Sequence, residues 1–261
     1  MNRLLVLALF LAACGDNLGT PDAHSHGGAP ADGAHVPVPR AVAVAGDFMS
    51  PGTGVVSRLE LTELHMRTNL VPGAALGDPV LRQYGDKLYV VNRFGSNNIT
   101  ILNAKTLQLE EQLGTGANSN PQDVAVVGNK LYVPALGTAG VVVLTPGSAM
   151  TKTIDLSALD TQGMNDGKPD CVSAYAIGTL VYVACGVLDN FDKVEVGKIA
   201  IIDSATDTMT MSTSMNYMNP YGFFTRAPAG STYTGDLLTH RSRTSRIIRR
   251  AASSASRPPE R

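Results

Sequence analysis

Short apolar runs separated by glycine-containing turns dominate the chain beyond residue 40. Three segments superimpose position by position: YGDKLYVV at 84–91, VGNKLYVP at 127–134 and IGTLVYVA at 177–184. In each segment a Gly-Asp, Gly-Asn or Gly-Thr pair stands between two apolar runs. This is typical of a two-residue hairpin loop whose glycine adopts a positive φ. The pattern therefore predicts the same β-hairpin three times.

A second hairpin is predicted downstream of each of these. Its first strand is ITILN at 99–103, VVVL at 141–144 or IAIID at 199–203. The turns at 103–106 and 203–206 begin with Asn103 and Asp203, whose side chains can cap their own turns. More polar strands follow at 107–113 and 208–213. Each unit is thus expected to contain four strands.

Four strands repeated every 43 to 50 residues is the period of a β-propeller blade. The inner strands are apolar on both faces, as expected when every blade is covered by a neighbour on each side. The outer strands alternate with charged residues, which protects an exposed edge. A β-sandwich would also contain many short strands, but it would not repeat one hairpin at a fixed spacing. The predicted fold class is therefore all-β, a β-propeller.

The motif KLYVVN at 87–92, followed by NITILN at 98–103, resembles the repeat of the YVTN family of β-propellers of bacterial and archaeal surface proteins. KLYVP at 130–134 matches this repeat well, and LVYVA at 180–184 has drifted from it. The resemblance covers roughly residues 41–224. It implies an architecture of about seven blades rather than an activity.

The number of blades leaves two arrangements open. Complete units fit near 78–113, 121–156 and 169–213, while residues 41–70 supply about three strands and 219–226 begin another unit. Closing this last strand onto the first three would give a ring of about four blades. The alternative is an open arc of a larger propeller.

The N-terminus predicts export and a lipid anchor. One positive charge at Arg3 precedes eight apolar residues at 4–11, which is too short to span a membrane but suits a signal peptide. The following LAAC, ending at Cys14, resembles the lipobox of bacterial lipoproteins, in which the cysteine is acylated. We expect a lipoprotein signal peptide at 1–13, lipidation of Cys14 and a flexible linker at 14–40. The protein would be anchored to the cell envelope, at the outer membrane or cell surface.

The charge is divided unevenly along the chain. Seven of the 21 Lys and Arg residues and one of the 22 Asp and Glu residues lie in 239–261, so this segment carries +6 and residues 1–238 carry −7. We expect propeller blades at 41–238 and a basic, disordered tail at 239–261. The tail could contact anionic lipid, but we favour its origin in a truncated or frameshifted gene. An exported lipoprotein has little opportunity to meet nucleic acid, which we exclude as a partner.

Cys171 and Cys185 are candidates for a disulfide in an oxidising compartment. They flank the predicted hairpin that turns at Gly178. A three-residue loop would place the two cysteines opposite each other, whereas a two-residue loop would shift the pairing by one residue. A bulge could reconcile the shorter loop with the bond.

The longest insertion, at 160–170, is rich in side-chain oxygen atoms and faintly resembles bacterial calcium loops. Its candidate ligands for a weak metal site are Asp160, Asn165, Asp166 and Asp170. Gln162 and Met164 stand where such loops have acidic ligands, so we favour a plain loop between strands. We therefore expect no cofactor, with calcium in this loop as the alternative.

The sequence contains no motif of a catalytic site: no zinc-protease HExxH, haem-attachment CxxCH, hydrolase GxSxG or P-loop. Between residues 41 and 238 the single histidine is His65, on a predicted outer strand. We therefore expect no enzyme but a non-catalytic propeller that binds a protein or glycan or builds the envelope. The alternative is a propeller enzyme, lactonase-like or quinone-dependent, whose catalytic blades are missing here.

Overall fold

The structure is a computed structural model that describes residues 40–161, 166–189, 192–193, 195–220, 222–227, 237–241 and 244–248. The described residues form β-strands and one short 3₁₀ helix, η1 (Ser157–Leu159). No helix among them is long and apolar enough to cross a membrane. The signal peptide and most of the linker expected at 1–40 lie outside the described residues.

Four antiparallel sheets follow one another along the chain, and we number them as blades 1 to 4. Each bears out a unit expected from the sequence. Blade 1 contains β1 (Arg40–Gly46), β2 (Gly54–Glu60) and β3 (His65–Arg67); blade 2 contains β4 (Pro79–Tyr84), β5 (Lys87–Asn92), β6 (Asn98–Asn103) and β7 (Leu109–Gly114); blade 3 contains β8 (Ala125–Val127), β9 (Lys130–Pro134), β10 (Gly140–Leu144) and β11 (Thr151–Asp155); blade 4 contains β12 (Cys171–Ile177), β13 (Leu180–Cys185), β16 (Val196–Asp203) and β17 (Thr208–Met218).

The predicted glycine turns are confirmed. The pairs Tyr84–Lys87, Val127–Lys130 and Ile177–Leu180 close two-residue loops whose first residues are Gly85, Gly128 and Gly178. Their φ angles are 57°, 59° and 61°. A residue with a side chain is strained at such angles, so glycine at this position sets the register of each hairpin.

The second turn of a blade is held by its first side chain, as expected. Asn103 Oδ1 accepts hydrogen bonds from the backbone N–H groups of Lys105 and Thr106, both at 3.0 Å. In blade 4, Asp203 Oδ1 accepts one from Ala205 at 2.9 Å. These side-chain bonds replace the ladder bonds that the backbone gives up when it reverses direction.

The blades pack face to face through strands that are apolar on both sides. In β9, Tyr132 contributes to the apolar cluster shared with blade 4, while its neighbours Leu131 and Val133 contribute to the cluster shared with blade 2. All three side chains are at most 1% exposed. Because side chains alternate along a strand, one short apolar strand can cover two neighbouring blades. The prediction of doubly covered inner strands is confirmed.

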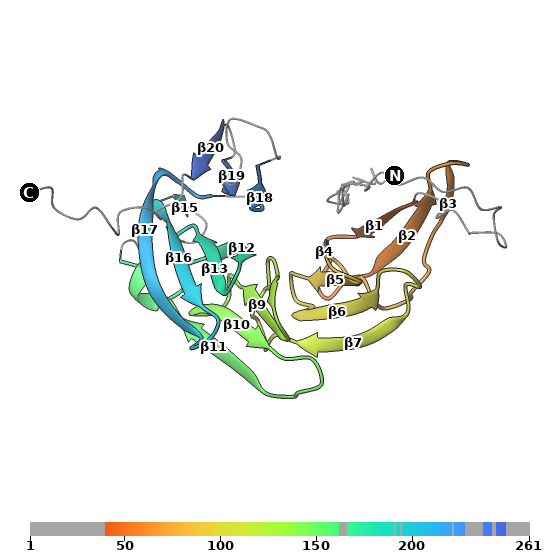
Figure 1. Cartoon of the computed structure of the whole chain (residues 1–261), viewed down its shortest axis with the longest axis horizontal. Helices are drawn as coiled ribbons and strands as arrows, with labels where there is room; N and C mark the ends of the chain where they lie inside the picture. The colour runs from red at the N-terminus through yellow and green to blue at the C-terminus, as the bar shows by residue number, and fades with distance from the viewer. Residues whose placement is uncertain are drawn as a thin grey trace, which may run out of the picture.

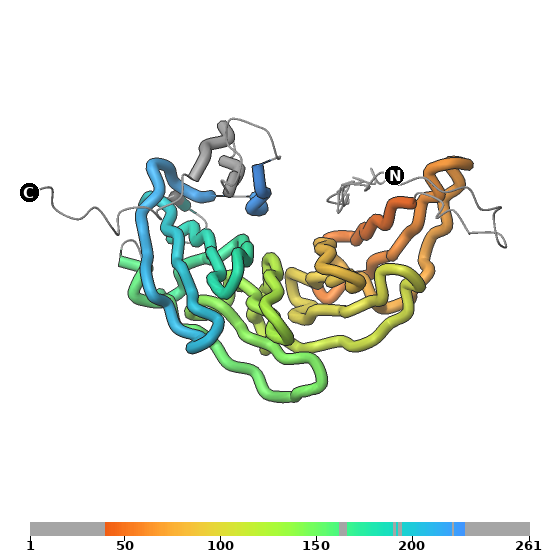
Figure 2. The backbone as a smooth tube through the Cα atoms, in the orientation of Figure 1, coloured from red at the N-terminus to blue at the C-terminus, as the bar shows by residue number. Residues whose placement is uncertain are grey.

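The blades form an arc, with blade 1 at one end and blade 4 near the other (Figures 1 and 2). Of the two arrangements expected, this is the open one: β18 (Thr225–Arg226) pairs with β19 (Leu237–Arg241) and not with blade 1. β1 corresponds to β5, the second strand of blade 2. The loop at 47–53 that follows β1 lies against the loop at 93–97 that follows β5. Ser96 Oγ donates a hydrogen bond of 2.9 Å to the Pro51 carbonyl oxygen between these loops.

Two features differ from the expectation. Within the segment 239–261, predicted to be disordered, the structure places most of β19 and all of β20 (Thr244–Ile248), which form a hairpin. This stretch contains the β-branched residues Thr239, Thr244, Ile247 and Ile248, which favour strands despite the arginines between them. A small hairpin of β14 (Leu188–Asp189) and β15 (Asp192–Lys193) also interrupts the connection between β13 and β16.

Candidate functional site

Cys171 and Cys185 are bonded to each other in the structure, and both are fully buried. The hairpin between them has the two-residue loop, so its ladder pairs Ser173 with Ala184. A bulge between Cys171 and Ser173 then moves the register by one residue and sets Cys171 opposite Cys185. The disulfide thus joins the first residue of β12 to the last residue of β13, at one end of blade 4. Cys14 lies outside the described residues, and its lipidation stays a prediction.

The proposed calcium ligands are only partly brought together. Asp160 is 4% exposed; its Oδ2 accepts the Gly167 N–H at 2.8 Å, and its buried Oδ1 has no hydrogen-bond partner in the described part of the chain. Asp170 Oδ2 accepts the Leu188 N–H at 2.8 Å, and burial raises the pKa of Asp170 to about 6, with the charges of Asp166 and Asp160 adding to the effect.

Asp166 differs from these two carboxylates because it is exposed and pairs with Lys168 at 3.0 Å. No three His, Cys, Asp or Glu side chains among the described residues are placed to hold one metal ion. Asn165 lies outside the described residues. In the part of the loop that the structure describes, these carboxylates turn to separate partners and do not form a calcium cluster.

Asn92, the last residue of the YVVN motif, is fully buried at the end of β5. Its Oδ1 accepts the Leu76 N–H at 2.9 Å, and its Nδ2 donates to the Ala74 carbonyl oxygen at 3.0 Å. Nδ2 also lies 3.2 Å from Thr100 Oγ1. The Asn92 side chain thus holds the segment that connects blade 1 to blade 2 against the end of β5. Its role in the motif is to position a loop.

A buried carboxylate joins blades 2, 3 and 4 at their innermost strands, which are β4, β8 and β12. Asp123, which is 1% exposed, precedes β8, and its Oδ1 accepts the Arg82 Nε–H of blade 2 at 2.6 Å. Its Oδ2 accepts the Ser173 hydroxyl of blade 4 at 3.0 Å and the Ala174 N–H at 3.1 Å. The inner strands of blades 2, 3 and 4 are therefore held at a fixed spacing.

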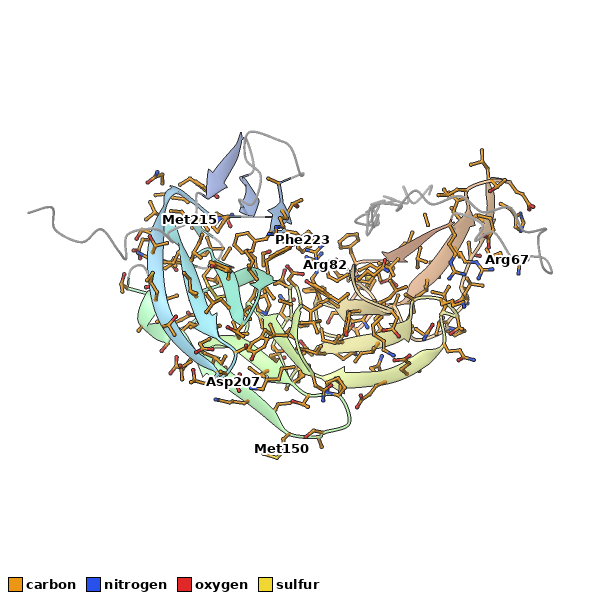
Figure 3. The ribbon with its side chains drawn as sticks, in the orientation of Figure 1. Arg67, Arg82, Met150, Asp207, Met215 and Phe223 are labelled. Atoms are coloured by element: carbon orange, nitrogen blue, oxygen red, sulfur yellow. A yellow bond between two sulfur atoms is a disulfide. The ribbon has the colours of Figure 1, made fainter. Side chains whose placement is uncertain are left out.

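Arg82 also contacts the segment that follows blade 4. Its guanidinium carbon lies 3.6 Å from the centre of the Phe223 ring, and the two side chains meet on the concave side of the arc (Figure 3). The Ser173 hydroxyl accepts the Phe224 N–H at 2.8 Å. These contacts hold the segment that follows blade 4 against Arg82 of blade 2 and Ser173 of blade 4.

The loops at 47–53 and 93–97 form one end of the blades, which we call the loop face. Each loop presents a phenylalanine two residues after its strand, Phe48 and Phe94, exposed by 54% and 51%. Their φ angles are 57° and 39°, in the left-handed region that favours glycine. Met49 beside them is 63% exposed. The rings of Phe48 and Phe94 are thus displayed from strained backbone positions.

Hydrogen bonds fix both phenylalanines in place. The Phe48 N–H donates to the Gly77 carbonyl oxygen at 2.7 Å, and the Phe94 N–H donates to Asn120 Oδ1 at 3.0 Å. The Asp47 carboxylate accepts the N–H groups of Met49 at 2.9 Å and Thr53 at 3.0 Å. The Met49 N–H is the main cause that lowers the pKa of Asp47. The loop face is therefore an ordered surface.

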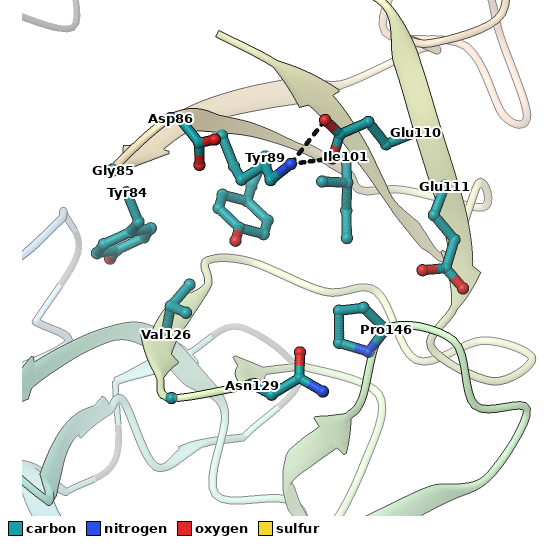
Figure 4. Close-up of a pocket in the computed structure, with 12 residues that line it drawn as sticks. Tyr84, Gly85, Asp86, Tyr89, Ile101, Glu110, Glu111, Val126, Asn129 and Pro146 are labelled. Carbon is teal, nitrogen blue, oxygen red and sulfur yellow. Dashed lines mark hydrogen bonds and ion pairs between the residues drawn. The ribbon is translucent and has the colours of Figure 1, made fainter.

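A cavity of about 580 Å³ lies between blades 2 and 3 at the opposite end of the strands, beside the glycine turns (Figure 4). We call it the inter-blade pocket. Tyr84, Tyr89 and Ile101 of blade 2 face Val126, Asn129 and Pro146 of blade 3 across it. Gly85, Asp86, Lys87, Glu110, Glu111 and Gly128 complete its lining.

Acidic groups dominate the rim of the inter-blade pocket. The Lys87 ammonium contacts both carboxylate oxygens of Glu110, at 2.6 and 2.5 Å. The bond to Glu110 raises the pKa of Lys87, and the bond to Lys87 lowers the pKa of Glu110. Both oxygens of Glu111 accept the N–H of Gly147, at 3.1 and 3.0 Å. Burial raises the pKa of the Tyr89 hydroxyl above its ordinary value.

Sequence reasoning missed both the loop face and the inter-blade pocket. The phenylalanines carry a signal, because Asp47-Phe48 and Arg93-Phe94 directly follow equivalent strands of consecutive repeats. The pocket carries none that one sequence reveals, since Tyr84 and Pro146 come from different blades. His65, expected on an outer strand, lies in β3 and is exposed.

The fold defines the class of the protein as a β-propeller. The chain is similar to the β-propeller domain of Cps50 (Swd1) from Myceliophteria thermophila, with 11% identity and a TM-score of 0.59 over 85% of this chain and 66% of that one. It is also similar to the WD40 β-propeller domain of Doa1, with 13% identity and a TM-score of 0.55 over 80% of this chain and 60% of that one.

A third similar structure is the hydrazine synthase of Kuenenia stuttgartiensis, with 18% identity and a TM-score of 0.43 over 63% of this chain and 46% of that one. The chain thus spans less than two thirds of the length of each of these three structures. No family model matches the sequence, and no curated protein matches it.

Proposed function

We propose that the chain is an exported, lipid-anchored propeller of the YVTN type that binds a protein or glycan partner through its loop face and has no catalytic role. Cys14 would carry the lipid and residues 14–40 would act as a tether. The blades would then stand away from the membrane on a spacer rich in Gly, Ala and Pro. Nucleic acid is not among the proposed partners.

The observation that carries this proposal is the pair Phe48 and Phe94. Holding a non-glycine residue in the left-handed region costs about 1–2 kcal/mol, which a folded protein tolerates where the surrounding structure fixes the residue. Both rings are half exposed and contribute little to the core. Rigid, exposed aromatic groups on ordered loops are typical of recognition surfaces.

The lipid anchor is supported by the N-terminal sequence. The apolar run at 4–11 ends in LAAC, with small residues directly before Cys14. One acyl chain binds membranes marginally, whereas two or more hold a protein stably. Acylation of both the thiol and the new amino group would therefore give a firm attachment.

The loop face is tested by replacing both phenylalanines with serine. Phe48→Ser with Phe94→Ser should abolish capture of envelope components by the purified protein, while leaving its thermal transition intact. The matched control is Met150→Ser, since Met150 is 81% exposed on an outer turn of blade 3. Equal capture by the double variant and the wild type would contradict the role of this face.

The anchor is tested separately by growing expressing cells with labelled palmitate. The label should enter the wild-type chain and be absent from Cys14→Ala, while Cys171→Ala with Cys185→Ala should keep it. Label that persists in Cys14→Ala would refute lipidation at this residue without affecting the proposal about the loop face.

A further inference from the structure

The inter-blade pocket carries an excess of negative charge that the described residues do not compensate. Its rim holds three carboxylates, those of Asp86, Glu110 and Glu111, and one ammonium group, that of Lys87. Lys87 is bound to both oxygens of Glu110. Glu111 is bound to the neutral N–H of Gly147, and within the described residues neither Asp86 nor Glu111 has an ion pair. Two negative charges therefore remain beside the cavity.

The walls of the pocket are aromatic and apolar. Tyr84 and Tyr89 meet edge to face, with ring centres 5.9 Å apart. The Tyr84 hydroxyl donates to the Val124 carbonyl oxygen at 2.8 Å, which fixes this ring in the wall. Ile101, Val126 and Pro146 supply the apolar remainder. Such walls favour a group with a flat, weakly hydrated cation and an aliphatic stem.

We propose that the inter-blade pocket binds an arginine side chain from an extended basic segment of a partner protein. A guanidinium group combines the positive charge that Asp86 and Glu111 require with a planar face that can stack on the partly exposed ring of Tyr84. Lysine would satisfy the charge but not the stacking, and anionic groups would be repelled. The volume of about 580 Å³ accommodates the arginine and part of the adjoining peptide.

This site is independent of the loop face. Tyr84, Gly85 and Lys87 lie at the start of β5, whereas Phe94 follows its end. A partner bound in the pocket would therefore leave the phenylalanines free. The chain could hold two partners at once, one at each end of its blades.

The test uses the full chain and two short probes in isothermal titration calorimetry. One probe is acetyl-Gly-Arg-Gly-amide, and the other replaces arginine with citrulline, which has nearly the same shape but no charge. We expect the arginine probe to bind at least about tenfold more tightly than the citrulline probe. Binding should also weaken as salt is added, because the attraction is partly electrostatic.

Variants locate the binding. Asp86→Asn and Glu111→Gln should each weaken binding of the arginine probe by about three- to fivefold, the effect of one exposed charge pair. Glutamine at position 111 keeps an acceptor oxygen for the Gly147 N–H, so the loop that contains Gly147 should stay in place. Glu63→Gln removes an exposed carboxylate from the turn between β2 and β3 and should leave the affinity unchanged.

Three results would overturn the proposal. One is equal affinity for the two probes, and another is equal affinity of the wild type and the double variant Asp86→Asn with Glu111→Gln. The third is binding that becomes detectable only after glutamine replaces the four arginines of residues 249–261. That result would assign the pocket to the chain's own C-terminal segment instead of to a partner.

Discussion

Arg82 and Asp123 lie on neighbouring blades, and the Nε of the arginine is 2.6 Å from the Oδ1 of the aspartate. The aspartate is buried, while about a quarter of the arginine side chain remains accessible. The same carboxylate accepts hydrogen bonds from Ser173 and Ala174 on the next blade. One side chain therefore determines how three inner strands are placed relative to each other.

We expect Asp123→Ala to lower the free energy of unfolding by about 3–5 kcal/mol, because it leaves a guanidinium and two buried donors without their acceptor. Urea titration followed by circular dichroism measures this loss. Asp123→Asn should lose less, since an amide oxygen still accepts one of the bonds. Lys168→Ala, which breaks the exposed pair with Asp166, should cost less than about 1 kcal/mol. A loss for Asp123→Ala as small as this control would contradict the proposed link between blades.

Removing the disulfide should destabilise blade 4. The bond joins residues 14 apart, and a loop of this length corresponds to about 3 kcal/mol. We expect Cys171→Ala with Cys185→Ala to shift the urea midpoint downward. Dithiothreitol should shift the midpoint of the wild type and leave the double variant unaffected. A wild-type midpoint that is insensitive to the reductant would show that the bond does not form in solution.

Two glycines should respond differently to alanine. At Gly85 a Cβ would meet nothing within 4 Å, so Gly85→Ala costs the left-handed conformation alone, about 1 kcal/mol. At Gly54 a Cβ would stand 2.4 Å from the Leu76 carbonyl oxygen, so Gly54→Ala must displace backbone and should cost more, about 2–3 kcal/mol. Thermal denaturation compares the two. Gly85→Asn should cost less than Gly85→Ala, because asparagine adopts this conformation more readily.

Asp170 should make the protein less stable as the pH rises from about 4 to 6. Burial raises its folded pKa from 3.8 to about 6, so in this range the folded chain holds a proton that the unfolded chain releases. Asp170→Asn removes this effect and keeps an acceptor for the Leu188 N–H. We expect the variant to match the wild type near pH 4 and to exceed it above pH 6 by about 1 kcal/mol, after allowance for solvent screening of a half-buried group. A difference between the two proteins that does not change with pH would contradict the raised pKa.

The repeated hairpins were predictable because their signals are local. Gly85, Gly128 and Gly178 require a positive φ, and Asn103 and Asp203 cap turns within three residues of themselves. The interactions that determine these turns are therefore made by residues that are close together in the sequence. For the hairpin that carries the disulfide, the sequence left two geometries possible, a longer loop or a bulge. It could not decide between them, because the choice depends on packing.

The contacts between blades could not be predicted in the same way. Asp123 is separated from Arg82 by 41 residues and from Ser173 by 50. Nothing near Asp123 in the sequence distinguishes it from an exposed loop carboxylate. The inter-blade pocket has the same origin, since its two walls belong to different repeats. Residues of this kind acquire their surroundings only when the blades assemble.

Repeat proteins whose units touch only their nearest neighbours can lose one unit at a time, beginning at an end. The chain of contacts from Arg82 through Asp123 and Ser173 to Phe224 works against such fraying, because releasing one inner strand disturbs the blades on both sides. Hydrogen exchange in blades 2, 3 and 4 should consequently proceed through a shared opening, with similar protection in all three. Blade 1, which Asp123 does not reach, would open at a lower free energy and set where proteolysis of the folded arc begins.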